Sequence, residues 1–175
     1  MASLLSCLSA ILLPLTPIGS VGMASATPRP AAAPTAAATP SVFLGKWELD
    51  LTRMPDTYGP PPKRVLFEFR DTGGGKWRTD VDIFDRDGGV RHMTMAYRPD
   101  GRPIAAETPN GEADSFAVLS PVPDVLVMNL GRARTMGSVR TYTMLPGGNE
   151  MIEAAAGLNG DGQPFVRTFH FKRVR

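Results

Sequence analysis

Apolar and polar side chains alternate along most of the chain after Ser41, which is the pattern of strands with one buried face. Val65, Phe67 and Phe69 share one face of a segment whose other face is charged. The same period recurs over residues 165–171, where phenylalanines face away from polar neighbours. No stretch shows the period of about 3.6 residues that marks an amphipathic helix. The pattern therefore predicts an all-β fold.

Glycine-rich turns separate these alternating segments. They supply the positive φ angles that tight hairpins require, and they are Thr72–Gly75, Arg86–Gly89, Pro99–Gly101, Pro109–Gly111, Pro146–Asn149 and Asn159–Gly162. The strands predicted between them are Lys46–Leu51, Lys63–Arg70, Lys76–Asp85, Val90–Arg98, Asp114–Ser120, Asp124–Leu130, Gly137–Leu145, Met151–Gly157 and Pro164–Val174. Short strands at this spacing predict an antiparallel up-and-down β-barrel of about eight to ten strands, with a sandwich as the alternative.

One predicted hairpin, Lys76–Arg98, has no clear inner face. Val81 and Ile83 lie on one face of its first strand. Phe84 on the same strand, and Met93, Met95 and Tyr97 on the second strand, suggest the other face. Mixed polarity on both faces suits a barrel with a partly polar lumen better than a dry sandwich. A closed meander also leaves no exposed sheet edge.

The first residues lack this alternation and form an apolar run over residues 4–18, broken by two prolines. The run is shorter than the roughly 20 residues of a bilayer span and is typical of a secretory signal peptide. Ala24-Ser25-Ala26 has the small side chains that a signal peptidase requires. We therefore predict a signal peptide over residues 1–26, with translation from a later methionine such as Met23 as the alternative.

Residues 27–40 contain only alanine, proline and threonine apart from Arg29. Such a composition buries little apolar surface and disfavours helix, so it predicts a disordered linker. A single barrel domain follows over residues 41–175. After processing, the protein would be secreted or periplasmic, without a transmembrane span.

Charge and cysteine content exclude several classes of function. The 19 basic and 17 acidic residues give a net charge of +2 and are interleaved rather than clustered, which argues against binding to nucleic acid. The only cysteine, Cys7, lies in the predicted leader, so the mature chain has no disulfide and no thiol nucleophile. With only two histidines besides, we expect no metal site and no cofactor.

The first predicted strand carries the motif Gly45-x-Trp47. A Gly-x-Trp motif at this position resembles the opening of lipocalins and their calycin relatives, which include the fatty-acid-binding proteins. The resemblance implies that Trp47 plugs one end of the barrel and that a cation from the last strand stacks on its ring. Arg173 or Arg167 would be that cation, because arginine has the planar group that lysine lacks.

The connection Gly59-Pro60-Pro61-Pro62-Lys63 extends the likeness. Together with the Gly-x-Trp-x-Leu start and the Asp-Gly hairpins, it resembles a group of exported bacterial lipocalin-like proteins of unassigned function. The resemblance implies a barrel over residues 43–175.

Arg140 and Tyr142 are two residues apart and so share a face, which Met144 extends. The fatty-acid-binding relatives use Arg-x-Tyr inside the barrel to hold a ligand carboxylate, although on the final strand. The resemblance thus makes Arg140 and Tyr142 candidate ligand residues, with an outward surface pair as the alternative. Arg167 shares the phenylalanine face of its strand and is a second inward cation candidate.

Methionine is abundant, at nine residues, and Met93 and Met95 fall on one predicted strand. Flexible thioethers adapt to ligands of irregular shape, so these two side chains are candidates for lining an apolar pocket. Ordinary filling of the core is the alternative.

Three hypotheses of function remain. The first is an exported, non-catalytic barrel that binds a small apolar or amphiphilic molecule, anionic ones included. The second is an envelope module with a filled barrel that binds a protein partner through its loops. The third is an isomerase or cyclase with an arginine to hold an acid and a buried carboxylate, such as Glu107 or Glu150, to move a proton. A lumen of roughly 300 Å³ or more would favour the first.

Overall fold

The structure is a computed structural model that describes residues 39–107 and 113–175. The predicted signal peptide and most of the linker lie outside these residues. The described elements, in chain order, are β1 (Gly45–Leu49), η1 (Leu51–Arg53), η2 (Asp56–Tyr58), β2 (Arg64–Gly73), β3 (Lys76–Phe84), β4 (Val90–Tyr97), β5 (Ile104–Ala105), β6 (Ser115–Val122), β7 (Val125–Arg132), β8 (Thr135–Met144), β9 (Glu150–Leu158) and β10 (Pro164–Val174). The predicted all-β fold is confirmed.

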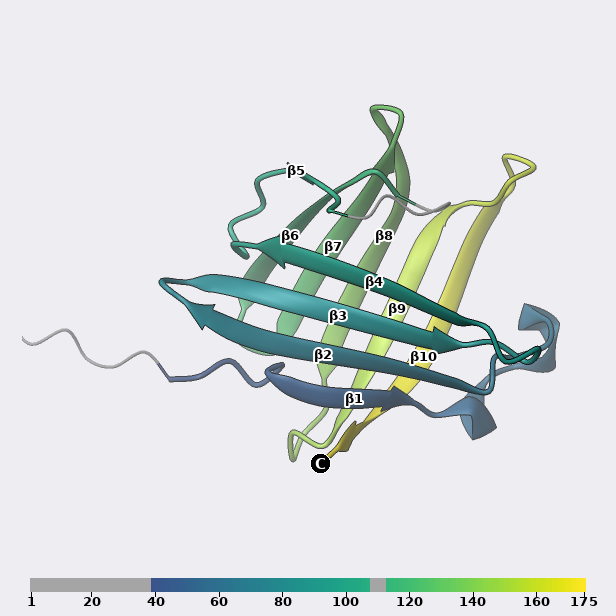
Figure 1. Ribbon diagram of the computed structural model, residues 1–175, viewed down its shortest axis with the longest axis horizontal. Helices are drawn as coiled ribbons and strands as arrows, with labels where there is room; N and C mark the ends of the chain where they lie inside the picture. The colour runs from purple at the N-terminus through teal and green to yellow at the C-terminus, as the bar shows by residue number, and fades with distance from the viewer. Residues whose placement is uncertain (1–38, 108–112) are drawn as a thin grey trace, which may run out of the picture. The chain divides into compact units, whose positions relative to one another are not determined.

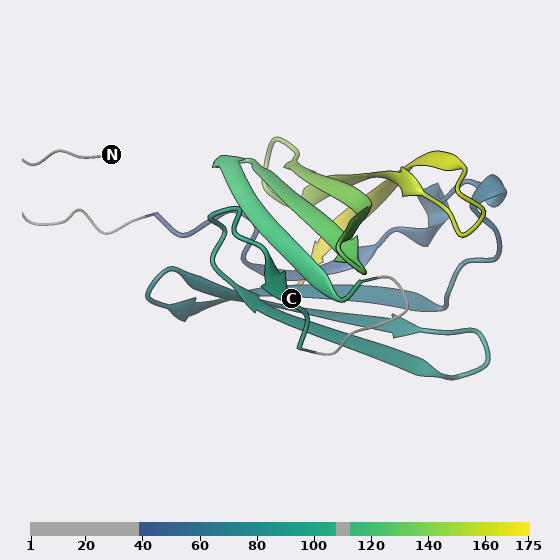
Figure 2. The ribbon, with the colours of Figure 1, turned by 90° about the horizontal axis from the view of Figure 1, so that it is seen from above.

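All ten strands belong to one antiparallel sheet in the order β4-β3-β2-β1-β10-β9-β8-β7-β6-β5. Strand β1 pairs with both β2 and β10, and this pairing curls the sheet back on itself. In Figures 1 and 2 the strands β2–β4 form one wall and β6–β9 form the wall that faces it. The architecture is the predicted up-and-down barrel.

The barrel is nearly closed rather than fully closed, because β4 and β5 end the strand order without pairing with each other. Side chains partly bridge this opening. The ring of Tyr97 on β4 lies edge-on to Phe116 on β6, with centroids 5.9 Å apart, and the Tyr97 hydroxyl shares a hydrogen bond of 2.7 Å with Thr79 Oγ1. Burial raises the pKa of Tyr97 to about 12.

All nine predicted strands are present, but the sequence did not reveal the two-residue strand β5. One tight turn was also missed because it contains no glycine at its tip. Ala133 and Arg134 connect β7 to β8 with φ angles of 51° and 64°, a backbone conformation that costs non-glycine residues energy.

The prediction of mixed faces in the hairpin Lys76–Arg98 was wrong. Val81 pairs directly with Met93 and Thr79 with Met95, and directly paired residues point to the same side of a sheet. The methionines therefore share the inner face with Val81, and the polar side chains of Asp80 and His92 lie outside. The misleading feature was Phe84, which is an outward, partly exposed residue at the strand end.

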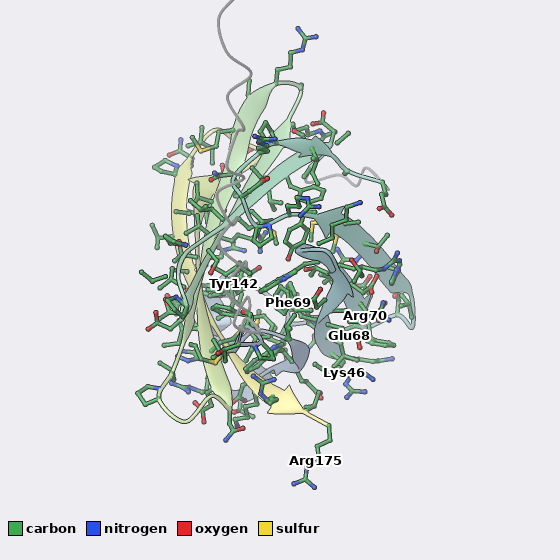
Figure 3. All side chains as sticks on the ribbon, turned by 90° about the vertical axis from the view of Figure 1, so that its left-hand side faces the viewer. Lys46, Glu68, Phe69, Arg70, Tyr142 and Arg175 are labelled. Atoms are coloured by element: carbon green, nitrogen blue, oxygen red, sulfur yellow. The ribbon has the colours of Figure 1, made fainter. Side chains whose placement is uncertain are left out.

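An aromatic core fills one end of the barrel. Trp47 is fully buried, its indole Nε1 donates to the carbonyl of Phe43 at 2.8 Å, and the Arg173 guanidinium lies over its ring. Phe69 and Tyr142 reach the same core from opposite walls, with ring centroids 6.2 Å apart. Figure 3 shows both pointing inward, whereas Lys46 and other charged side chains point outward.

Among the described residues, no helix is long and apolar enough to span a membrane.

Candidate functional site

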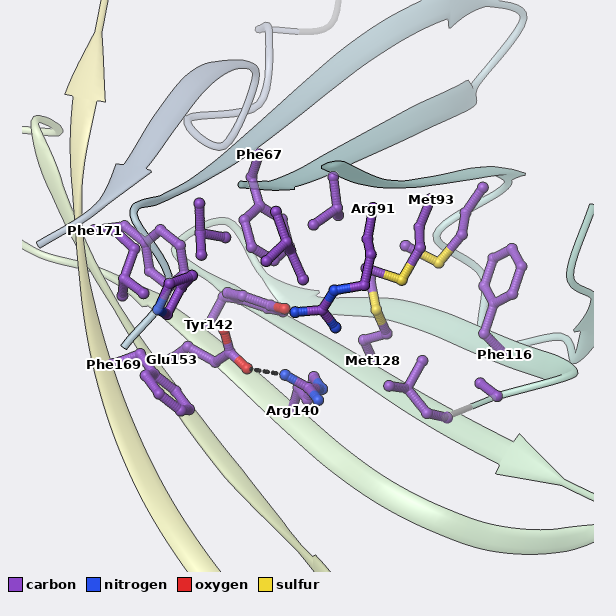
Figure 4. A pocket seen from close by; sticks show the side chains of 18 of the residues that line it. Phe67, Arg91, Met93, Phe116, Met128, Arg140, Tyr142, Glu153, Phe169 and Phe171 are labelled. Carbon is purple, nitrogen blue, oxygen red and sulfur yellow. Dashed lines mark hydrogen bonds and ion pairs between the residues drawn. The ribbon is translucent and has the colours of Figure 1, made fainter. Parts of the chain in front are cut away.

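The barrel encloses a cavity of about 360 Å³. One wall is mostly apolar and comes from the inner faces of β2, β3 and β4. Its apolar lining side chains include Val65, Phe67, Val81, Ile83, Met93 and Met95, and β4 also contributes Arg91. The opposite wall is partly polar and comes from β8, β9 and β10, whose lining side chains are Arg140, Tyr142, Glu153, Arg167, Phe169 and Phe171. Figure 4 shows the two walls facing each other across the cavity.

Cross-strand pairing arranges the polar lining residues in rows that run across β8, β9 and β10. Arg140 on β8 and Arg167 on β10 both pair with Ala155 on the strand between them. The next row toward the closed end pairs Tyr142 with Glu153. The small side chain of Ala155 leaves space between the two arginines, so the inner surface carries two cationic groups on one row and a carboxylate on the next.

Arg140 and Glu153 form an ion pair in which Glu153 is buried and Arg140 is partly buried. Arg140 Nη1 donates to Glu153 Oε1 at 2.6 Å, and their side chains are 20% and 2% exposed. Taking both charges out of water is costly, and only close, hydrogen-bonded geometry offsets that cost. The pair is net neutral, so it presents a donor and an acceptor to the cavity rather than a net charge.

Arg167 has a different environment. Its guanidinium lies 5.2 Å from the ring centroid of Tyr58 and 5.5 Å from that of Phe165. Within residues 39–107 and 113–175 it forms no ion pair with a carboxylate. Since Arg167 is exposed, it offers its donors to a group that approaches the cavity from solvent.

Tyr58 fixes the segment that follows β1 against β10. Its hydroxyl accepts a hydrogen bond of 2.9 Å from the Thr168 backbone N–H, and its ring lies edge-on to Phe169. This contact holds Met54 and Pro62, which flank Tyr58 in sequence, at the cavity that they help to line.

A third arginine, Arg91, lines the cavity from β4. Its side chain is 62% exposed and forms a two-point ion pair with Asp85, at 2.8 Å for each hydrogen bond. These hydrogen bonds hold the pKa of Asp85 below its usual value. Figure 4 shows the Arg91 side chain directed into the cavity.

The predicted site residues divide between three places. The cavity lining includes Arg140, Tyr142, Arg167, Met93 and Met95, so Arg140 and Tyr142 form an inward pair rather than the alternative surface pair. Met144 is buried beside Met151 but does not line the cavity. Gly45, Trp47 and Arg173 lie together at the closed end, and Arg167, the other candidate for stacking on Trp47, faces the lumen instead.

Sequence reasoning missed Glu153 and Arg91. Glu153 follows Met151 at the spacing of one inner face, but the neighbouring alanines gave no reason to choose that face. The two carboxylates that were considered lie elsewhere. Glu107 is exposed, and Glu150 lies 3.6 Å from Arg53 with both side chains 45% exposed.

The sheet order and the plugged end define the fold as an up-and-down, lipocalin-like β-barrel. No family model matches the sequence, and no curated protein matches it. Several solved structures, in contrast, are similar to this chain. The fluorescent protein UnaG is 12% identical with a TM-score of 0.53, over 75% of this chain and 97% of that chain.

Two further structures show the same likeness. Fatty-acid-binding protein 1 of Echinococcus granulosus is 15% identical with a TM-score of 0.52, over 77% of this chain and 98% of that one. Lipid binding protein 8 of Caenorhabditis elegans is 12% identical with a TM-score of 0.51, over 76% and 96% of the two chains. At identities of 12–15%, the likeness shows that the fold is shared and says nothing of a shared function.

Proposed function

We propose that the barrel binds a small amphiphilic molecule in its lumen, with an apolar tail against β2–β4 and an anionic group at the arginines of the facing wall. The observation that carries this proposal is the cavity of about 360 Å³, which has a mostly apolar wall from β2–β4 and arginines among its lining residues. A cavity of this size is within the usual range for small-molecule sites. It also argues against the alternative of a barrel filled by its own side chains.

The charges of the lining support an anionic ligand. Among the described lining residues, Arg91, Arg140 and Arg167 face a single carboxylate, Glu153. Arginine binds carboxylates and phosphates through two parallel hydrogen bonds. The names of two similar structures, a fatty-acid-binding protein and a lipid binding protein, agree with a ligand of this class.

The proposal can be tested by titrating the purified protein with dodecanoate and with dodecanol, each followed by displacement of a fluorescent apolar probe. We expect both to bind, and dodecanoate more tightly. Arg167→Gln should weaken dodecanoate by about tenfold and leave dodecanol nearly unchanged, because one charge-assisted hydrogen bond contributes roughly 1.5–3 kcal/mol.

Lys46→Gln is the matched control, since Lys46 is exposed and points away from the lumen. It removes the same charge and should change neither affinity. Failure of both ligands to bind would contradict the proposal. Native mass spectrometry of protein purified from its own source would identify a ligand that copurifies.

A second candidate is proton transfer in the lumen, and Glu153 beside Arg140 is the observation that favours it. An arginine that holds an acidic substrate next to a buried carboxylate is an arrangement suited to an isomerase or a cyclase. The test is deuterium exchange at the α-carbon of a medium-chain β-keto acid in heavy water. Exchange that is catalysed by the wild type and lost in Glu153→Gln would support this candidate.

We further propose that the protein is exported, either to the periplasm or to the medium. The apolar leader, the Ala24-Ser25-Ala26 motif and the alanine-, proline- and threonine-rich linker support this proposal. N-terminal sequencing of the mature protein should then begin at Thr27. A mature chain that retains Met1 or Met23 would contradict export by cleavage.

A further inference from the structure

Glu153 is an unusual residue for the wall of an apolar cavity. Its side chain is 2% exposed, and it pairs across the sheet with Tyr142 on one side and Phe169 on the other. It therefore lies in the row that holds the aromatic side chains of Tyr142 and Phe169, next to the row that holds Arg140 and Arg167. Figure 4 shows its carboxylate turned toward Arg140 at the cavity wall.

The ion pair with Arg140 makes this part of the wall a poor site for a second carboxylate. An anion placed there would gain the attraction of Arg140 and suffer the repulsion of Glu153 at similar range. An ionised carboxylate accepts several hydrogen bonds, and a guanidinium donates several. The pair is thus suited to a neutral group that both donates and accepts, and a hydroxyl is the smallest group that does both.

The cation available to an anionic headgroup lies nearer the solvent. Arg167 stacks on Tyr58 and Phe165 without an acidic partner among the described residues. Its position on β10 is diagonal to Glu153 on β9, and diagonal neighbours in a sheet lie about 7–8 Å apart. Its guanidinium lies over the rings of Tyr58 and Phe165, at the exposed side of β10. The anionic and neutral polar sites are therefore separated along the cavity.

We infer that the ligand of this barrel is a hydroxylated amphiphilic acid. Its carboxylate binds Arg167 at the outer end of the cavity, and a hydroxyl partway along its chain donates to Glu153 and accepts from Arg140. The separation of the two sites places this hydroxyl in the middle of the chain rather than beside the carboxylate or at the tail. The inference rests on the proposed function and specifies its ligand class.

The experiment compares dodecanoate with its α-hydroxy, mid-chain hydroxy and ω-hydroxy derivatives on the wild-type protein. We expect the mid-chain compound to bind about tenfold more tightly than dodecanoate, the gain of one well-placed hydrogen bond to a charged group. The α-hydroxy and ω-hydroxy compounds should show no such gain. The mid-chain keto acid should also lack it, because a carbonyl cannot donate to Glu153.

The double variant Arg140→Met/Glu153→Met provides the protein-side test. It replaces the ion pair with apolar groups of similar size, a change that buried pairs often tolerate. It should lose the tenfold preference for the mid-chain hydroxyl, whatever its affinity for dodecanoate. Arg167→Gln should weaken both acids equally and keep that preference.

The outcomes separate the two proposals. If neither dodecanoate nor any derivative binds, the proposed function fails. If the acids bind but no derivative is preferred, if the gain falls at the α or ω position, or if it persists in the double variant, this inference alone is overturned. The ligand comparison on the wild-type protein decides the matter even if the double variant does not fold.

Discussion

The guanidinium of Arg173 lies over the indole of Trp47, with its central carbon 4.1 Å from the ring centroid. The same group donates to three backbone carbonyls, those of Leu44 at 2.7 Å, Val42 at 2.6 Å and Gly148 at 2.9 Å. One side chain on β10 thus ties the segment before β1 to the turn between β8 and β9. Burial lowers the pKa of Arg173 from its usual value, but the group remains charged at neutral pH.

Arg173→Lys should destabilise the protein although it keeps the positive charge. An ammonium cannot stack as a plane on the indole and cannot reach three carbonyls in fixed directions. We expect a loss of about 1–3 kcal/mol in the free energy of unfolding, measured by urea denaturation. Arg175→Lys, at the exposed C-terminus, is the control and should cost little. Equal midpoints for the two variants would contradict this role of Arg173.

Gly45 should be intolerant of a side chain for two independent reasons. Its φ is +121°, and a Cβ atom placed there would lie 2.7 Å from Arg173 Nη1. Gly45→Ala should therefore cost about 1–3 kcal/mol and displace the guanidinium from Trp47. Denaturation together with Trp fluorescence would measure both effects. The control is Gly160→Ala, where an added Cβ meets no atom within 4 Å.

The Arg140–Glu153 pair should show strong coupling in a double-mutant cycle. Arg140→Met leaves a buried carboxylate without its cation, which costs about 3–5 kcal/mol. The double variant with Glu153→Met should recover most of that loss, to within about 1 kcal/mol of the wild type. Urea denaturation of the two single variants and the double variant gives the coupling energy. Additive losses would show that the ion pair does not hold the two side chains together.

The strands could be predicted because their signals are local. Alternation fixes the inner face of a strand such as β2, and glycines fix the hairpins that bound it. The Gly45-x-Trp47 motif was found differently, through its resemblance to the opening of lipocalins. Alternation does not identify β5, which is only Ile104–Ala105 and is too short to alternate.

The polar wall of the cavity depends on register, which a single sequence does not contain. Arg140 could be chosen because Tyr142 shares its face. Glu153 could not be chosen from the sequence, because its pairing with Tyr142 depends on the lengths of β8 and β9 and of the turn between them. A polar residue at an inward position, between Met151 and Ala155, is the only local signal, and it is visible once the inner face is known.

Asp50 makes the stability of the fold sensitive to acid. Lys172 lies 2.7 Å from its carboxylate, and Thr52 donates a hydroxyl at 2.6 Å. These contacts, that of Lys172 above all, lower the pKa of Asp50 from 3.8 to about 2. A lowered pKa contributes stability that is fully present above the unfolded value and is lost as the pH falls toward 2.

Asp50→Asn should accordingly be less stable than the wild type at neutral pH and should lose less stability between pH 4 and pH 2. The urea midpoint measured across this range tests the prediction. Asp161→Asn, on an exposed turn, is the matched control and should follow the wild-type curve. A parallel curve for Asp50→Asn would mean that its ion pair does not contribute to acid sensitivity.

Filling the cavity should weaken ligand binding without removing a charge. Met95 lines the cavity from β4 and pairs with Thr79 on the inner face of the barrel. Met95→Trp places an indole in the space of about 360 Å³ at a packing cost of about 1–3 kcal/mol. In probe displacement, dodecanoate should then bind at least tenfold more weakly, because the indole occupies space in which the ligand chain would bury its apolar surface. Met136→Trp, at a side chain that is 70% exposed, should bind normally. Equal affinities for the two variants would place the ligand on the outer surface rather than in the lumen.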